Sequence, residues 1–251
     1  MQRSRRMTTV TVVALVMAGL FVYQELSSPV ELTHTSEQQH SLTAQLSSES
    51  TTANGQNYKI PYAVDVLNTL SVKGRAPKTG YTRTQFGNGW SSIDGCDMRN
   101  IILNRDLTNT IISDICKVTR GTLVDPYTGK VVEFTRGENT SDDVQIDHVV
   151  ALSNAWQTGA QQLDYETRVS FANDALELLA VEGGANQAKG DGDAATWLPS
   201  NKSFRCEYVA RQIAVKYRYS LWVTLPEKNA MIKVLNTCPN QKLPPRTAPF
   251  S

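Results

Sequence analysis

Apolar residues between positions 60 and 152 change from a helical to an extended spacing. Within residues 60–72 they lie three or four apart, which predicts a helix. Two runs of β-forming residues then flank "DPYTGK", where Pro and Gly favour a turn, so residues 116–137 are predicted to form a β-hairpin. The segment "DVQIDHVVAL" is a further β-rich run. The period of residues 100–109 is ambiguous between a short helix and a strand.

Beyond position 152 the pattern becomes helical. Four helices are predicted within residues 153–162, 164–174, 201–222 and 225–238, and Asp164 is a candidate N-cap for the second of them. The order is a helix, a hairpin, a strand and then several helices. It predicts an α+β fold with a small sheet and helices packed on it.

The N-terminal segment has the pattern of an export signal. Three arginines lie within "MQRSRR", and residues 7–23 then carry no charge. A cleaved signal peptide and an uncleaved membrane anchor both fit residues 1–25, and either places the rest of the chain in the medium or at the outer face of the membrane. Residues 26–58, rich in Ser, Thr and Gln, are predicted to be a linker, residues 59–239 the folded domain, and residues 240–251 a Pro-rich tail.

The four cysteines agree with an oxidising compartment. Their number is even, and no two have a C-x-x-C spacing, so two disulfides are expected rather than a zinc site. Three pairings exist, and local loops close most easily. The predicted bonds are Cys96–Cys116 and Cys206–Cys238.

Net charge argues against a protein that coats nucleic acid with a basic surface. The chain has 25 basic and 24 acidic residues, and without residues 1–25 the balance is −1. Binding of a polyanion would need a local patch or a metal ion.

His148 is the candidate for chemistry because the other two histidines lie in the linker. A neutral imidazole is a good general base near pH 7, since its reference pKa is about 6.5. Asp147 beside it is a hard oxygen ligand for a cation such as Mg²⁺. The plainer interpretation is a histidine packed at the end of a strand. Adjacent side chains of a regular strand also point to opposite faces, so a shared site requires the strand to begin, twist or bulge there.

A second polar cluster follows the apolar run "ALELLAV". Within "GGANQAKGD", Asn186 supplies a carboxamide oxygen that can bind a metal, and Lys189 supplies a point charge for phosphate. Alone, the cluster could equally be an ordinary polar loop.

Together, "DHVVALSNAW" and "LELLAVEGGANQAKGD" resemble the motif of the HNH, or His-Me finger, nucleases. The resemblance is to an exported form of the nuclease domain that ends the GmrSD-type restriction enzymes, and it extends over residues 62–238. It implies a ββα-metal core, a β-hairpin followed by a helix that grips one divalent ion, with Mg²⁺ expected first and Mn²⁺ as the alternative.

The resemblance also implies roles for single residues. Asp147 and Asn186 would bind the metal, His148 would be the general base, and Lys189 matches a lysine often found after the motif. Glu177 departs from the family, because many of its members have Asn at that position.

The implied activity is metal-dependent endonuclease hydrolysis of nucleic acid, DNA first, by a monomer. Arg211 and Arg218 share a helix face and are candidates for phosphate contacts, and Arg99 is placed there by the resemblance alone. Two other functions stay open: a non-catalytic cell-surface binding protein that retains the fold, and a phosphoesterase acting on small substrates. A membrane attachment through residues 7–23 is expected if the leader is not cleaved.

Overall fold

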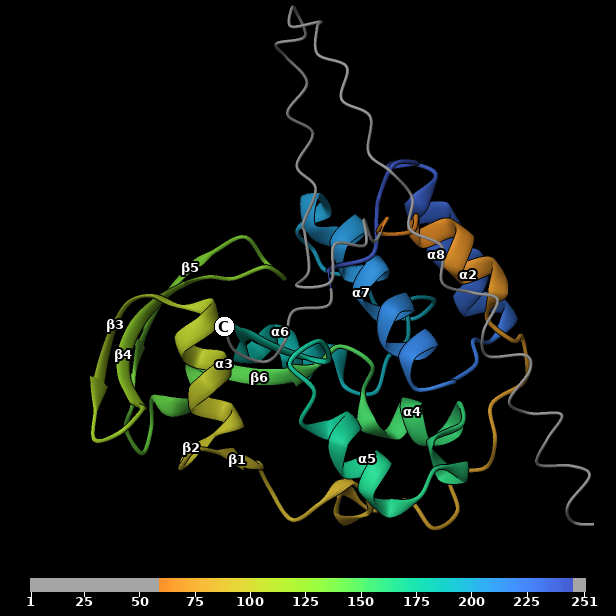
Figure 1. Cartoon of the computed structure of the whole chain (residues 1–251). Helices are drawn as coiled ribbons and strands as arrows, with labels where there is room; N and C mark the ends of the chain where they lie inside the picture. The colour runs from red at the N-terminus through yellow and green to blue at the C-terminus, as the bar shows by residue number, and fades with distance from the viewer. Residues whose placement is uncertain (1–58, 246–251) are drawn as a thin grey trace, which may run out of the picture. The chain divides into compact units, whose positions relative to one another are not determined.

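The computed structural model describes residues 59–245, so the predictions for residues 1–25 and 26–58 lie outside the described residues. Helices and small sheets alternate along the chain, as the α+β prediction requires (Figure 1). The α-helices are α2 (Ala63–Thr69), α3 (Met98–Asp106), α4 (Leu152–Gln157), α5 (Tyr165–Ala172), α6 (Gly183–Lys189), α7 (Arg205–Arg218) and α8 (Leu225–Leu235). The strands are β1 (Ser92–Ile93), β2 (Cys96–Asp97), β3 (Thr108–Ser113), β4 (Lys117–Val124), β5 (Val131–Thr135), β6 (Val144–His148) and β7 (Leu178–Glu182). Four short 3₁₀ helices are η1 (Arg83–Phe86), η2 (Ser141–Asp143), η3 (Ala160–Gln162) and η4 (Lys202–Phe204).

The hairpin predicted around "DPYTGK" is confirmed as β4 and β5. The two strands pair antiparallel from Val124↔Val131 to Arg120↔Thr135. β3 adds a third strand in the order β3-β4-β5, and α3 precedes it. The ambiguous segment 100–109 is therefore mostly helix, and its last two residues begin a strand.

A second antiparallel ribbon, β6–β7, lies between two hydrophobic cores. β6 and β7 pair from Val144↔Glu182 to His148↔Leu178. Val144, Ile146, Leu178 and Ala180 belong to the smaller core, which contains residues of α3, β4 and β5. Leu179 and Val181 belong to the larger core. The ribbon is buried on both sides because alternate residues of a strand face opposite ways.

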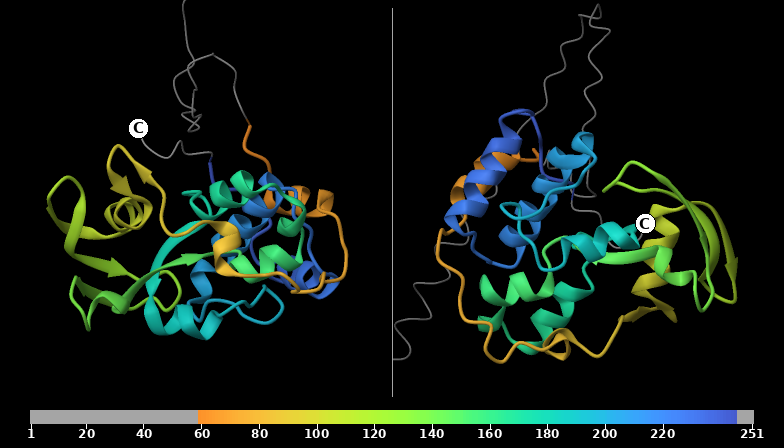
Figure 2. Two further views of the ribbon diagram at one scale, coloured as in Figure 1. Left: turned by 90° about the horizontal axis from the view of Figure 1, so that it is seen from below. Right: turned by 180° about the vertical axis from the view of Figure 1, so that it is seen from behind.

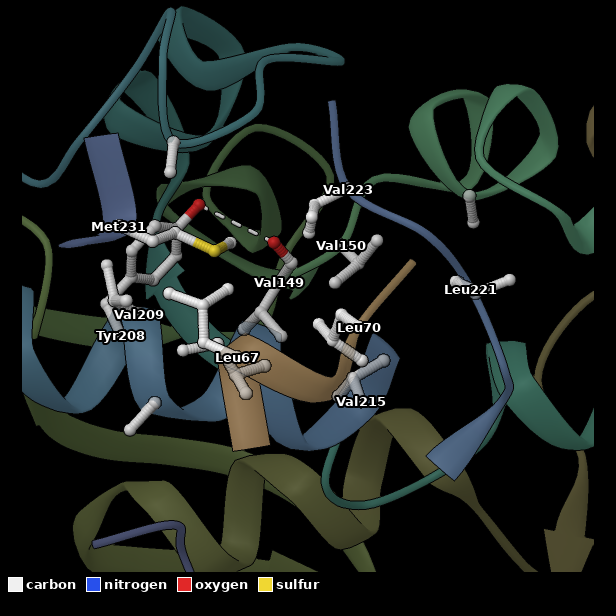
Figure 3. Close-up of a cluster of buried hydrophobic side chains, with 14 of the residues drawn as sticks. Leu67, Leu70, Val149, Val150, Tyr208, Val209, Val215, Leu221, Val223 and Met231 are labelled. Atoms are coloured by element: carbon white, nitrogen blue, oxygen red, sulfur yellow. Dashed lines mark hydrogen bonds between the residues drawn. The ribbon is translucent and has the colours of Figure 1, made fainter. Parts of the chain in front are cut away.

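The larger core is built mainly by helices. Residues from α2, α7 and α8 surround Val149 and Val150, which directly follow β6 (Figure 3). Figures 1 and 2 show α2, α7 and α8 at one end of the molecule and the sheet β3–β4–β5 at the other, with β6 and α6 between them. The end of β6 is therefore held on both sides by packed structure.

Side chains cap the starts of four helices, α3, α5, α6 and α8. The predicted cap at α5 is confirmed, since the Asp164 carboxylate accepts a hydrogen bond from the Thr167 backbone N–H at 2.6 Å. α8 begins with a capping box in which Thr224 and Glu227 each accept from the other's backbone N–H.

Both predicted disulfides are confirmed. Cys96–Cys116 ties β2 to the residue before β4, and Cys206–Cys238 ties the first turn of α7 to the segment after α8. The Cα–Cα separations are 5.8 Å and 6.5 Å. The bonds close loops within the two ends of the molecule and leave the β6–β7 ribbon between them.

Among residues 59–245, no helix combines the length and the apolar character that a membrane crossing requires.

Candidate active site

The candidate site is built on a strand–strand–helix unit. β6 pairs with β7, and α6 starts directly after β7. Gly183 opens α6 against the backbone carbonyl of Asp142, where a side chain would collide with that oxygen. The Glu182 carboxylate caps the helix by accepting a hydrogen bond from the Ala185 N–H at 2.6 Å. These contacts place the face of α6 that carries Asn186 and Lys189 against β6.

Asp147 is a buried carboxylate with a donor on each oxygen. Its side chain is only 7% exposed. Tyr127 donates its hydroxyl to Oδ2 at 2.5 Å, and Lys189 donates its ammonium to Oδ1 at 2.9 Å. Burial raises the pKa of the Asp147 carboxyl above its ordinary value, and the Lys189 and Tyr127 contacts oppose that rise.

Lys189 is enclosed rather than presented to solvent. Its side chain is 0% exposed, and besides Asp147 it donates to the backbone carbonyl of His148 at 2.8 Å. The structure therefore joins the last residue of α6 to the last two residues of β6 through one ammonium group.

His148 is packed at the end of β6. Its Nε2 lies 3.0 Å from the Ala172 carbonyl oxygen, and its ring stacks on Trp90 with an interplanar angle of 9°. A carbonyl oxygen only accepts, so Nε2 carries the proton in this contact. The other nitrogen, Nδ1, then holds the free lone pair, and it makes no hydrogen bond within the described residues.

Burial also decides the charge of His148. Loss of solvent contact lowers its pKa to about 3, with a smaller lowering by Arg83 and Lys189 that the Ala172 contact opposes. The imidazole is consequently neutral at physiological pH, the protonation state that a general base requires, but so low a pKa also makes it a weaker base than a free imidazole.

Asp147 and His148 leave β6 on opposite faces. Gln145 and Asp147 point toward α6 and the larger core, whereas Ile146 and His148 point toward the smaller core and Trp90. β6 ends at His148 and pairs with β7 without a register shift, so the strand neither begins nor bulges there, as a shared site was expected to require. Both side chains therefore lie at the end of the strand, but on its two sides.

Asn186 lies on the Asp147 side. Its Nδ2 donates to Gln145 Oε1 at 2.9 Å, and its Oδ1 accepts no hydrogen bond within residues 59–245. Asn186 and Gln145 thus bring a carboxamide oxygen to the same face as the Asp147 carboxylate. One carboxylate and one carboxamide oxygen fit the hard-oxygen preference of Mg²⁺, which keeps several waters of its own. Lys189 is the one group in this set that opposes a cation.

The described residues hold no cluster of three or more His, Cys, Asp or Glu side chains suited to a metal ion. The predicted metal ligands, Asp147 and Asn186, do not form such a cluster.

Comparison with known proteins identifies the family. The family of GmrSD restriction endonucleases, C-terminal domain, matches residues 97–234, more than half of the chain. The chain belongs to this family. The matched range includes β6, β7 and α6, and with them Asp147, His148 and Asn186.

A relative of this GmrSD C-terminal family member is described as an uncharacterized secreted protein of Arthroderma benhamiae. The two are 41% identical over 179 residues, which cover 70% of this chain and 84% of the relative. No solved structure matches the chain.

Glu177 departs from the family motif, as the sequence analysis noted. It forms hydrogen bonds with the backbone next to His148. Its carboxylate accepts from the Val150 N–H at 3.2 Å, and its own carbonyl accepts from the Val149 N–H at 2.9 Å. The side chain is 0% exposed, and burial raises its pKa well above the ordinary value. These contacts secure the two residues that follow His148.

Replacing Glu177 with glutamine is expected to change the unfolding free energy by about 1 kcal/mol or less, because the amide oxygen can still accept from Val150. Alanine should cost about 1–3 kcal/mol, since a buried N–H is left without a partner. Urea unfolding of both variants measures this. Metal affinity should stay within a few-fold in Glu177→Gln. A loss as large as that of Asp147→Ala would instead make Glu177 a metal ligand.

The arginines predicted to bind nucleic acid make contacts within the protein. Arg99 donates to the backbone carbonyls of Ser141 and Val144, at the start of β6. Arg211 donates to the Leu178 carbonyl at 3.2 Å and is largely buried. Arg218 pairs with Asp174 at 3.0 Å and keeps 43% of its side chain exposed. Of the three, Arg218 is the most open to a phosphate.

Sequence reasoning missed four side chains in or near the site. Tyr127 comes from the turn of the β4–β5 hairpin, Gln145 from β6, and Trp90 from the loop before β1. Only Gln145 had a local signal, because it lies two residues before Asp147 and shares its face of the strand. Arg83 was also missed; it is exposed and close enough to His148 to lower its pKa.

The stability of the protein is expected to fall between about pH 6.5 and pH 3 partly because of His148. In this range the unfolded chain binds a proton at His148 that the folded protein rejects, so stability is lost as pH falls. The slope is roughly 1.4 kcal/mol per pH unit for one group. Urea unfolding of wild type and His148→Asn at pH 4, 5, 6 and 7 isolates the effect. Parallel curves for the two proteins would contradict it.

Proposed function

We propose that the chain is an exported, metal-dependent endonuclease that hydrolyses phosphodiester bonds of nucleic acid, with DNA as the first substrate to test. Membership in the GmrSD C-terminal family supports the reaction class. The observation that carries the proposal is the hydrogen bond between His148 Nε2 and the Ala172 carbonyl. It orients a neutral imidazole so that Nδ1 is the nitrogen able to accept a proton.

In the proposed reaction His148 Nδ1 takes a proton from the attacking water. The ring is held by Trp90 on one face and by the Ala172 carbonyl at its edge, so little reorientation is needed before proton transfer. Glu177 fixes the backbone that follows the ring and acts as a positioning residue.

Asp147 and Asn186 would hold one divalent ion, Mg²⁺ first and Mn²⁺ as the alternative. The ion, when bound, supplies stabilisation of negative charge on the scissile phosphate and the leaving 3′ oxygen. The strand–strand–helix order of β6, β7 and α6 agrees with a ββα-metal core. A phosphodiester lying across the end of β6 would contact both faces, and the exposed Arg83 is close enough to His148 to lower its pKa.

The competing function is a binding protein that has kept the fold without the chemistry. The contact of Lys189 with Asp147 favours it, because the ammonium neutralises the carboxylate without any metal ion. A plasmid-nicking assay with Mg²⁺, Mn²⁺, Ca²⁺ and Zn²⁺ separates the two functions. Cleavage that EDTA abolishes and Mg²⁺ or Mn²⁺ restores supports the nuclease. Intact plasmid under every metal would contradict it.

The same assay with a small phosphodiester separates a nuclease from a phosphoesterase of small substrates. The nuclease should prefer polymeric DNA, because a chain of phosphates can reach basic side chains away from the reacting bond. Equal or faster hydrolysis of the small ester would favour the phosphoesterase.

Export is part of the proposal. It rests on the arginine-led apolar segment of residues 1–25 and on the relative described as secreted. Fractionation of expressing cells should place the protein in the medium or the membrane fraction. A protein confined to the cytosol would contradict export. The monomeric state stays a prediction.

A further inference from the structure

We propose that Lys189 and the divalent ion compete for Asp147, so that the Lys189 ammonium occupies the place of the ion when no metal is bound. This inference rests on the metal site of the proposed function and concerns how that site is loaded. In the metal-free protein the Lys189 ammonium neutralises Asp147. Metal binding displaces the ammonium and frees its charge.

The competition follows from the contacts of the Asp147 carboxylate. Lys189 Nζ lies 2.9 Å from Oδ1, and the Tyr127 hydroxyl lies 2.5 Å from Oδ2. Each oxygen therefore already receives one donor. A hydroxyl can rotate its proton away from an incoming cation, but an ammonium group keeps its charge in every orientation. Of the two partners, Lys189 is the one that a metal ion must move.

Burial makes it unfavourable for the Lys189 ammonium and a metal ion to bind Asp147 at the same time. The side chains of Lys189 and Asp147 are 0% and 7% exposed. Like charges repel more strongly where water is excluded than at a surface, because the effective dielectric constant is lower. A doubly charged ion on Asp147 would have the ammonium as its immediate neighbour. The two cations are therefore expected to exclude each other.

A second buried lysine shows what a fixed ammonium looks like in this fold. Lys216 Nζ contacts Asn154, Thr158, the Trp222 carbonyl and Glu227. Its three N–H groups therefore have acceptors on several elements. Lys189 Nζ has two acceptors within the described residues, Asp147 and the His148 carbonyl. One of its three donors is left over, which makes this ammonium the easier one to displace.

A pocket next to the site could accommodate the displaced Lys189 ammonium. Lys189 borders an open pocket of about 290 Å³ that Arg75, Asp191 and Trp197 also line, while its own side chain is 0% exposed in the metal-free protein. Asp191 is a half-exposed carboxylate whose present partners are Lys78 at 3.4 Å and Ser153 at 3.1 Å. A lysine released into this pocket stays beside the site, where its charge can meet a phosphate. Lys189 would then neutralise Asp147 before the metal binds and contact a phosphate after it has bound.

The test measures Mn²⁺ binding to the metal-free full chain by titration calorimetry, without any substrate. Lys189→Met removes the charge, Lys189→Gln removes it while keeping a hydrogen-bond donor, and Lys189→Arg keeps it. Mn²⁺ affinity should rise at least about tenfold in the Met and Gln variants and stay within about threefold of wild type in the Arg variant. The gain should vanish when Asp147→Ala is added to Lys189→Met.

Circular dichroism shows which variants are folded. If Lys189→Met does not fold, Lys189→Gln provides the neutral variant for the titration. Unchanged or weaker Mn²⁺ affinity in the neutral variants overturns the inference, as does the absence of Mn²⁺ binding by every protein. The nicking assay is a separate readout. Tighter Mn²⁺ binding in the neutral variants with no DNA cleavage by wild type would support the competition and refute the nuclease. Metal-dependent cleavage with unchanged Mn²⁺ affinities would support the nuclease and refute the competition.

Discussion

Replacing His148 with alanine is expected to slow DNA cleavage by about 10²–10⁴-fold while the protein stays folded, which is the usual cost of losing a general base. The imidazole is held between Trp90 and the Ala172 carbonyl, with Nδ1 left to accept a proton. Alanine removes that nitrogen without touching the Asp147 and Asn186 oxygens. Single-turnover cleavage of a labelled duplex at saturating Mg²⁺ measures the loss.

His148→Asn is the matched control for packing. Asparagine can still donate to the Ala172 carbonyl but supplies no basic nitrogen, so it should be nearly as slow as alanine. Circular dichroism and Mn²⁺ binding should show wild-type behaviour in both variants. A folded His148→Ala protein that cuts DNA at the wild-type rate would return His148 to the role of a packed residue at the end of a strand.

Replacing Asp147 with alanine is expected to lower the unfolding free energy by about 3–5 kcal/mol, because it leaves the Lys189 ammonium buried without its counter-ion. The Tyr127 hydroxyl loses its acceptor in the same change. Adding Lys189→Met should recover part of the loss, since the buried charge is then absent. Urea unfolding of the two single variants, the double variant and wild type gives the coupling between the two residues.

Lys78→Ala provides the comparison on the surface. Lys78 pairs with Asp191 at 3.4 Å, and its side chain is 54% exposed, so its loss should cost less than about 1 kcal/mol. An Asp147→Ala protein as stable as Lys78→Ala would mean that Lys189 finds water or another acceptor when its partner is removed. In that case the ion pair between β6 and α6 would not stabilise the site.

Local sequence was sufficient for the elements whose signals are local. The period of Ala63, Val66 and Leu67 predicted α2, and "DPYTGK" predicted the turn between β4 and β5. Asp164 was predicted as a cap and is one. Loop length alone selected the two disulfides that form. In each case the deciding interactions join residues close in the chain.

The strand β7 was not predicted, for a physical reason. "LLAV" is buried on both faces, so it lacks the alternation of polar and apolar residues that marks a half-exposed strand, and a short apolar run does not distinguish a strand from a helix. Its pairing with β6 joins residues 30 to 38 positions apart, and no local signal specifies such a pairing. The third strand, β3, was missed for a related reason, since its residues are mostly exposed.

By itself, the sequence indicated the family, which the family match confirms, and it predicted Asp147, His148 and Asn186 as site residues because they stand in a recognisable motif. It could not determine how these residues are partnered. Tyr127 reaches Asp147 from a hairpin turn twenty positions away, and Lys189 reaches it from the end of α6. Such contacts are set by how the β6–β7 ribbon packs between two cores, because long-range packing decides which side chains lose water and which charges meet. Only the tertiary structure could therefore show that burial lowers the pKa of His148 and that Asp147 is already paired.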